Sequence, residues 1–345
     1  MSDQPPLPEV PNPRLDVAHT RRGTRRLMSG PDAVSLGRLA DRPGDIPWRG
    51  WRRVLKRTGT AMLGDRVSLV AAGCAFYATL ALFPSISMLI SVYGLVFDPV
   101  TVEPQLEVLR GLLPPTVFTL ISERVHMLVT KPPSSLGWSL ALSTGLAFWS
   151  SATGVKSILA ALNLAYEERE QRSILRFQVL AFTITLIAVI SAVVGLAVLV
   201  GLPPLLSFLG VSAGQKALVR VLSFTMLVGA LLVGLSLLYR YGPCRERPRW
   251  RWVTPGSAVA TVLWIAASAA FSAYVANVAS YDATYGPLGT VVGMMMWFFV
   301  TVYAVLLGAE LNAELELQTA RDSTDGPPRP LGARGAFVAD HVAED

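Results

Sequence analysis

The sequence has few charged residues for its length. Of 345 residues, 16% are charged and 52% are apolar, and the mean hydropathy is +0.46. Soluble domains carry about a quarter charged residues, which keep their surfaces in water. Here the charge is missing from six runs, at 67–97, 132–155, 177–215, 221–239, 252–281 and 283–309. A soluble all-α protein would need amphipathic helices to cover so much apolar surface, so these runs argue against that class.

Cysteine and histidine are also scarce. Cys74 lies inside an uncharged run and Cys244 lies between two runs, so the sequence predicts no disulfide. The three histidines, His19, His126 and His341, are far apart along the chain. A metal-dependent nuclease or hydrolase gathers histidines and carboxylates around its ions. We therefore expect no metal site, no cofactor and no enzymatic activity.

Each uncharged run is about long enough for one crossing of a membrane. A hydrocarbon core about 30 Å thick takes ~20 helical residues, and a helix satisfies its own backbone hydrogen bonds in lipid. The sequence therefore predicts an all-α polytopic membrane protein, a bundle of six transmembrane helices. The predicted spans are 69–97, 136–156, 178–202, 218–240, 254–279 and 286–310.

Proline and small residues add detail to these spans. We expect Pro84 to kink the first helix rather than split it. The run 177–215 is long enough to hide a re-entrant segment, although Pro203-Pro204 is typical of a helix end. In the fifth span Gly256 and Ala260 begin a series of small residues at multiples of four, which favours close packing between helices.

The positive charge is distributed unevenly between the two ends of the spans. Of the 30 lysines and arginines, 25 lie on the side of the termini and five lie on the other side. Cytoplasmic loops carry the excess of lysine and arginine, so both termini are predicted to be cytoplasmic. The expected partners are membrane lipids, with anionic headgroups at the basic loops, rather than nucleic acid. Homo-oligomerisation stays open.

The segments outside the spans divide the chain further. Residues 1–47 are rich in proline and arginine and are predicted to be a disordered arm without a secretory signal, and 318–345 a disordered tail. The membrane domain is expected to cover 48–317. Its first part, 48–66, mixes tryptophan with basic residues, which indicates either a helix lying on the cytoplasmic leaflet or an ordinary flanking charge cluster. Between the first two spans, 98–135 predicts two short external amphipathic helices.

Four stretches together resemble the YihY/BrkB family of bacterial inner-membrane proteins, formerly labelled ribonuclease BN. They are "LVAAGCAFYATLALFPSISML" at 69–89, "AFWSSATGVKSILAALNLAYEEREQRS" at 147–173, "YRYGPCRERPRWRWVTPGSAVATVLW" at 239–264 and "YVANVASYDATYGPLGTVVGMMMWFFVTVYAVLLGAELNAELE" at 274–316. The resemblance covers roughly 50–317. It implies a six-helix domain in the inner membrane with both ends cytoplasmic, and roles in envelope integrity or transport.

Polar residues at the predicted cytoplasmic ends of the spans are the first candidates for a functional site, because polar groups are costly in hydrocarbon. Lys156 ends the second span, and Asn163 and Tyr166 follow it. Their spacing allows one polar stripe that enters the bundle from the cytoplasm. The simpler interpretation is a lysine that reaches the interface with its long side chain.

The sixth span continues into an acidic stretch. Glu310 lies near the interface, and Asn312, Glu314 and Glu316 follow it. Negative charge at a helix C-terminus opposes the helix dipole, so a cation should compensate it. We expect Glu310 to pair with Lys156, Arg172, Arg176 or Arg240 and so to hold the sixth span to a neighbour. On this basis Glu310→Gln should reduce the folded yield more than Glu316→Gln.

A role in a substrate or proton path is the alternative for Glu310, and Asn312 belongs to the same stretch. At the other end of the span, Asp282 is the single charge of the short external turn and is expected either to cap the helix or to gate an outer vestibule. These residues and the polar stripe favour transport or export of a small solute or a lipid-like amphiphile. A scaffold that maintains the cell envelope is the second hypothesis, and a ribonuclease is the weakest.

Overall fold

The fold was analysed in a computed structural model. It describes residues 31–64, 67–94, 118–119, 122–123, 126, 138–208, 213–277 and 287–343. The first 30 residues, Asp282 and most of the predicted external helices therefore lie outside the described residues. The described part is helical, in agreement with the predicted all-α class. Its elements are α2 (Pro31–Ser35), η1 (Pro43–Asp45), α3 (Trp48–Gly64), α4 (Val67–Gly94), α7 (Trp138–Ala165), α8 (Ile174–Phe208), α9 (Ala213–Tyr241), α10 (Trp250–Asn277), α12 (Pro287–Leu317) and α13 (Phe337–Asp340).

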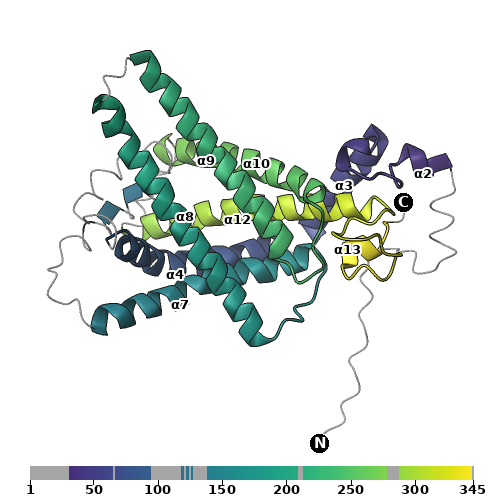
Figure 1. Cartoon of the computed structure of the whole chain (residues 1–345), viewed down its shortest axis with the longest axis horizontal. Coiled ribbons are helices and arrows are strands. Elements are labelled where there is room, and N and C mark those ends of the chain that lie inside the picture. Colours follow the sequence, from purple (N-terminus) through teal and green to yellow (C-terminus); the bar gives the residue numbers. More distant parts are fainter. Residues whose placement is uncertain are drawn as a thin grey trace, which may run out of the picture.

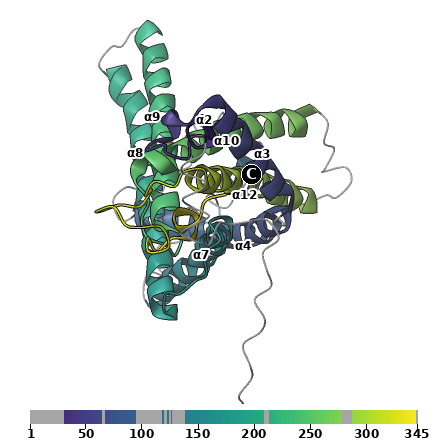
Figure 2. The ribbon, with the colours of Figure 1, turned by 90° about the vertical axis from the view of Figure 1, so that its right-hand side faces the viewer.

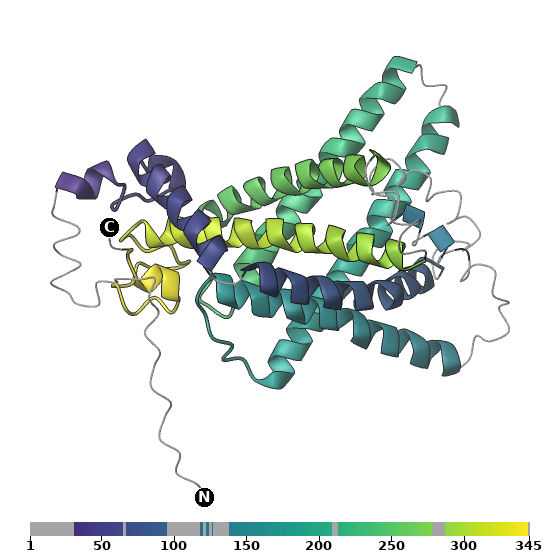
Figure 3. The same cartoon turned by 180° about the vertical axis from the view of Figure 1, so that it is seen from behind.

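The long helices pack around α12. This helix runs through the middle of the bundle, with α10 on one side and α4 and α7 on the other, while α8 and α9 cross the bundle at an angle (Figures 1 and 3). Helices α2, α3 and α13 gather at the end of the bundle where α12 ends, which faces the viewer in Figure 2. We call this the capped end. The sequence predicts that it is the cytoplasmic end.

Among the described residues, four helices are long and apolar enough to cross a membrane, namely α8, α9, α10 and α12. The number becomes five if α3 and α4, which are bent by 64° relative to each other, count as one broken span. Large apolar side chains such as Leu186 and Ile190 on α8 and Val233 on α9 are exposed along these helices, as expected of lipid-facing positions. The described helices thus support a multi-pass membrane protein. Six spans remain a prediction.

The proline predictions have different outcomes. Pro84 lies inside α4, which continues through it, so the first run is not split. By contrast, α8 does not end at Pro203-Pro204 but continues to Phe208, so that prediction is wrong. The two prolines follow 29 helical residues of α8, counted from Ile174, and the helix tolerates them four residues before its end.

The prediction of disorder at both ends of the chain is wrong for the residues that the structure describes. Residues 36–46 lie against the end of α12, and Gln318, which directly follows this helix, donates to the carbonyl of Leu36 at 2.7 Å. The segment after α12, residues 318–343, folds over the capped end, and we call it the C-terminal segment. It buries Val338, Ala339 and Val342. Composition does not predict this ordered structure, because the contacts come from residues elsewhere in the chain. Composition alone does not reveal such partners.

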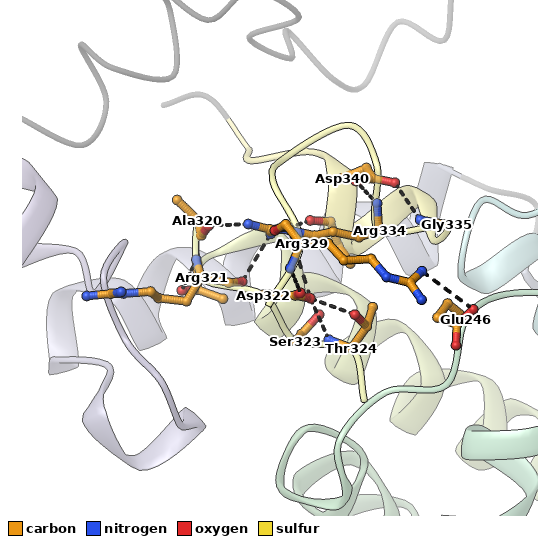
Figure 4. A network of polar contacts seen from close by, with 12 residues as sticks. Glu246, Ala320, Arg321, Asp322, Ser323, Thr324, Arg329, Arg334, Gly335 and Asp340 are labelled. Carbon is orange, nitrogen blue, oxygen red and sulfur yellow. Dashed lines mark hydrogen bonds and ion pairs between the residues drawn. The ribbon is translucent and has the colours of Figure 1, made fainter. Parts of the chain in front are cut away.

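Hydrogen bonds to charged side chains hold the C-terminal segment in place (Figure 4). Arg334 is buried and donates to the carbonyls of Ala320, Arg321, Arg329 and Ala339. The Asp340 carboxylate accepts the backbone N–H groups of Gly332, Arg334 and Gly335 at 2.8–3.0 Å. The pKa of Asp322 lies below its ordinary value, because hydrogen bonds to its carboxylate, first from the Thr324 hydroxyl, outweigh burial.

Candidate functional site

The last turns of α12 carry a cluster of buried polar side chains. Glu310, Asn312, Glu314 and Glu316 are all at least nine-tenths buried. Burying carboxylates is costly unless cations and hydrogen bonds compensate them. Each face of this helix end therefore needs a partner, and different elements of the chain supply them.

Glu316 forms a fully buried ion pair with Arg245, from the loop between α9 and α10. One guanidinium nitrogen of Arg245 lies 2.8 and 2.7 Å from the two carboxylate oxygens, and both side chains have no exposed surface. The Ser323 hydroxyl donates to the same carboxylate at 2.6 Å. Burial acts to lower the pKa of Arg245, but the Glu316 carboxylate outweighs it and the pKa is raised. Arg245 thus keeps its charge although it has no contact with water.

Tyr166 lies under this ion pair at the end of α7. The guanidinium carbon of Arg245 is 4.7 Å from the centre of the Tyr166 ring, within the range of a cation–π contact. Complete burial raises the pKa of the Tyr166 phenol, so it is neutral at physiological pH. The charges of Glu310 and Glu316 both act on the phenol, and the Asn312 amide lies beside it. The end of α7 and the end of α12 thus share one polar cluster.

Asn312 joins α12 to the beginning of α10. Its side-chain oxygen accepts the backbone N–H of Gly256 at 2.8 Å, and its side-chain nitrogen donates to the carbonyl of Val253 at 3.1 Å. Pro255 interrupts the hydrogen-bond ladder of α10 at this level, since proline has no N–H to donate. A Cβ on Gly256 would collide with the carbonyl oxygen of Gly308, so the two glycines allow a close approach of the two helices. The predicted packing role of Gly256 is confirmed.

A cavity of about 350 Å³ lies beside this cluster at the capped end. It is lined by residues of α3, of the end of α12, of the end of α7 and the loop that follows it, and of α13. Glu314, one of its lining residues, accepts a hydrogen bond from Arg57 of α3 at 2.6 Å, and Arg57 also donates to Gln318 at 2.8 Å. The full lining is Arg57, Thr60, Ala61, Gly64, Ala165, Glu167, Glu310, Ala313, Glu314, Leu317 and Val338.

The predicted site residues do not form a single stripe. Tyr166, Asn312 and Glu310 come together, as described above. Asn163 lies nearby, but it organises a loop: its amide donates to Glu170 at 2.9 Å and accepts the backbone N–H of Cys244 at 2.7 Å. Lys156 points elsewhere, with its ammonium 3.2 Å from the Gln178 side-chain oxygen on α8 and 5.5 Å from the Trp149 ring centre.

Three of the four cations expected for Glu310, namely Arg172, Arg240 and Lys156, contact other residues. Arg172 pairs with Glu170 at 2.9 Å, Arg240 pairs with Asp325 at 2.8 Å, and Lys156 bonds to Gln178. Glu310 lines the cavity. For Glu314 and Glu316, the compensation expected of the acidic helix end comes from Arg57 and Arg245.

Sequence reasoning missed Arg57, Arg245 and the whole C-terminal segment. The total charge of the basic loop 240–251 does not distinguish a buried arginine from exposed ones. One available signal was the resemblance itself, because Arg245 lies inside one of the quoted stretches.

Comparison with known proteins agrees with the membrane architecture. The family model of virulence factor BrkB matches residues 58–331, which covers α3 from Thr58 onward, every long helix and part of the C-terminal segment. The chain belongs to the virulence factor BrkB family. The predicted resemblance is confirmed, and the match extends beyond the quoted stretches at the C-terminal side.

Several individual proteins are similar in sequence to this BrkB-family chain. A putative ribonuclease-like protein YfkH of Bacillus subtilis is 29% identical over 71% of this chain and 88% of its own length. A UPF0761 membrane protein of Laribacter hongkongensis is 24% identical over 77% of this chain and 60% of its own length. One from Vibrio vulnificus is 24% identical over 73% and 78%. No solved structure matches the chain.

Proposed function

We propose that this BrkB-family membrane protein transports or exports a small solute or a lipid-like amphiphile, and that the cavity at the capped end is its cytoplasmic binding site. The cavity is the observation that supports the proposal most directly. Its volume of about 350 Å³ lies at the lower end of the range usual for small-molecule sites. Its lining combines small and apolar residues with Arg57 and carboxylates, as expected of a site that binds a molecule with both apolar and charged parts.

The position of the cavity supports the same proposal. It lies against α12, which contacts α3, α4, α7, α10 and α13, so a shift of α12 would reach most of the bundle. We propose six spans in the bacterial inner membrane with both termini cytoplasmic, based on the uncharged runs and the excess of positive charge. In this arrangement the cavity lies at the cytoplasmic end of the bundle.

Reconstituted protein tests the proposal with two probes. An NBD-labelled lysophospholipid reports amphiphile movement through its protection from dithionite, and osmotic swelling in glycerol reports movement of a small solute. We expect at least one probe to move faster than in protein-free liposomes. Thr60→Trp should slow that movement by filling the cavity rim, whereas Gly59→Trp, next to it, should not, because nothing lies within 4 Å of a Cβ there.

If both probes move no faster in proteoliposomes than in protein-free liposomes, the transport proposal is overturned and an envelope scaffold is favoured. The folded C-terminal segment is the observation that favours this second function, because it contacts Arg38, the loop after α7 and the loop before α10 at one end of the bundle. For an enzyme no comparable argument exists. The name of the Bacillus relative describes it as ribonuclease-like, whereas the sequence places the three histidines of this chain far apart.

A further inference from the structure

Helix α3 has two faces of different chemistry. Gly50, Val54, Thr58, Ala61 and Met62 are buried on one face, against α12 and the residues that precede α3. The opposite face is exposed. Positions 48, 52, 55, 59 and 63 recur on it every three or four residues, so they form one stripe along the helix.

The exposed face combines large apolar and basic side chains. Trp48 is 71% exposed, Leu55 48% and Leu63 86%. Arg49, Arg52 and Lys56 are exposed beside them, and α3 contains no aspartate or glutamate. A helix surface in water does not favour tryptophan and leucine at such exposure. The combination is typical of helices that lie at the level of lipid headgroups, with aromatic and apolar groups towards the acyl chains and cations at the phosphates.

The position of α3 places this face near the membrane boundary. Gly64 ends α3 and Val67 begins α4, so the chain enters the bundle within three residues. The two helices are bent by 64° relative to each other, and α3 crosses the capped end rather than continuing along the bundle (Figures 1 and 3). An elongated face across the end of a membrane bundle is well placed to contact one leaflet along its length.

We infer that the exposed face of α3 binds anionic phospholipid headgroups in the membrane leaflet at the capped end. Its net positive charge complements the negative surface of the cytoplasmic leaflet. The binding has a consequence inside the protein, because the same helix supplies Arg57, Thr60, Ala61 and Gly64 to the cavity. Lipid bound outside holds this wall of the cavity against α12, where Arg57 contacts Glu314. This inference requires no transport activity.

An environment-sensitive label tests the contact in the full chain. Cys74→Ala and Cys244→Ala remove the native thiols, and Leu55→Cys carries an NBD group on the exposed face. The protein is placed in nanodiscs of phosphatidylcholine, or of an equimolar mixture with phosphatidylglycerol. We expect NBD emission at position 55 to shift to the blue in the anionic discs and to shift back in high salt. A label at Pro328→Cys, exposed in the C-terminal segment, should emit equally in both.

Charge variants separate a site on α3 from general attraction. The triple variant Arg49→Gln, Arg52→Gln, Lys56→Gln should lose the blue shift at position 55, since each basic residue contributes about fivefold to binding at an anionic surface. A control triple variant, Arg42→Gln, Arg169→Gln, Arg321→Gln, removes the same charge from other exposed positions. It should keep the blue shift at position 55. Equal emission in both lipids, or an equal loss in both triple variants, would overturn the inference.

Discussion

The lipid-facing helices and the capped end are stabilised in different ways. In α9, 11% of an 18-residue apolar stretch within Val221–Tyr241 is buried within the chain, compared with 39% of the corresponding stretch within Val291–Leu317 in α12. Apolar side chains on α9 need no protein partner in a membrane, because lipid covers them as well as protein would. The capped end instead buries charges and amides that need exact partners. The comparison predicts that single polar substitutions matter at the capped end, and that small-to-large changes matter where helices cross closely.

The largest effect should come from the buried ion pair of Glu316 and Arg245. Glu316→Gln leaves the Arg245 guanidinium buried without its counter-charge, and breaking one partner of such a pair costs about 3–5 kcal/mol. The free energy of unfolding in detergent measures it. Glu246→Gln is the matched control, because its carboxylate is 3.9 Å from Arg329 and both side chains are more than 40% exposed. It should change stability by less than about 1 kcal/mol.

This expectation reverses the one drawn from the sequence, in which Glu310→Gln was the more harmful of the two changes. Glu316 is 1% exposed, its carboxylate makes three polar contacts, and it forms the fully buried pair with Arg245, so the loss of its charge should be the more costly change. If Glu316→Gln and Glu246→Gln destabilise the protein equally, the buried pair does not hold the capped end, and the contrast with α9 loses its basis.

A smaller effect should follow from filling the crossing of α10 and α12. In Gly308→Ala, the new Cβ would lie 2.5 Å from the Gly256 carbonyl oxygen and 2.6 Å from the Tyr239 hydroxyl. Overpacking of this kind costs about 1–3 kcal/mol. Gly229→Ala on α9 is the control: nothing lies within 4 Å of its Cβ, so the change should be neutral or slightly stabilising. The free energy of unfolding of both variants, measured in the same detergent, tests this difference. Equal stability of the two variants would contradict the contrast between α9 and the crossing of α10 and α12.

The same contrast explains what the sequence could predict. Hydrocarbon imposes a length and a composition on each helix, so α8, α9, α10 and α12 could be predicted from uncharged runs. The pairing at the capped end could not, because Arg245 and Glu316 are 71 residues apart and no local pattern joins them. The prediction of disorder in the C-terminal segment was wrong for a related reason. Its proline- and glycine-rich composition is that of a disordered tail, while Arg334 and Asp340 hold its backbone through specific hydrogen bonds.

The smallest effect concerns the pH dependence of the contact between α13 and the end of α7. The Glu168 carboxylate accepts the backbone N–H of Phe337 at 2.7 Å. Burial raises the pKa of Glu168 above its ordinary value of 4.5; the Phe337 N–H and Arg245 act to lower it, and the charges of Asp340 and Glu316 add to the increase. The folded chain therefore binds a proton at Glu168 more readily than the unfolded chain does. Stability from this group is present at acid pH and is lost as the pH rises through the folded pKa.

Glu168→Gln should remove this dependence, because glutamine keeps the acceptor oxygen without the charge. Hydrogen exchange of residues 336–340, corrected for the intrinsic effect of pH, should slow in the native chain as the pH falls from neutral towards 5. In the variant it should stay constant. Glu170→Gln is the control: hydrogen bonds outweigh burial and lower the pKa of Glu170, so its stabilising contribution is lost only below about pH 4.5. A slope that survives in Glu168→Gln would assign the pH dependence of this contact to another group.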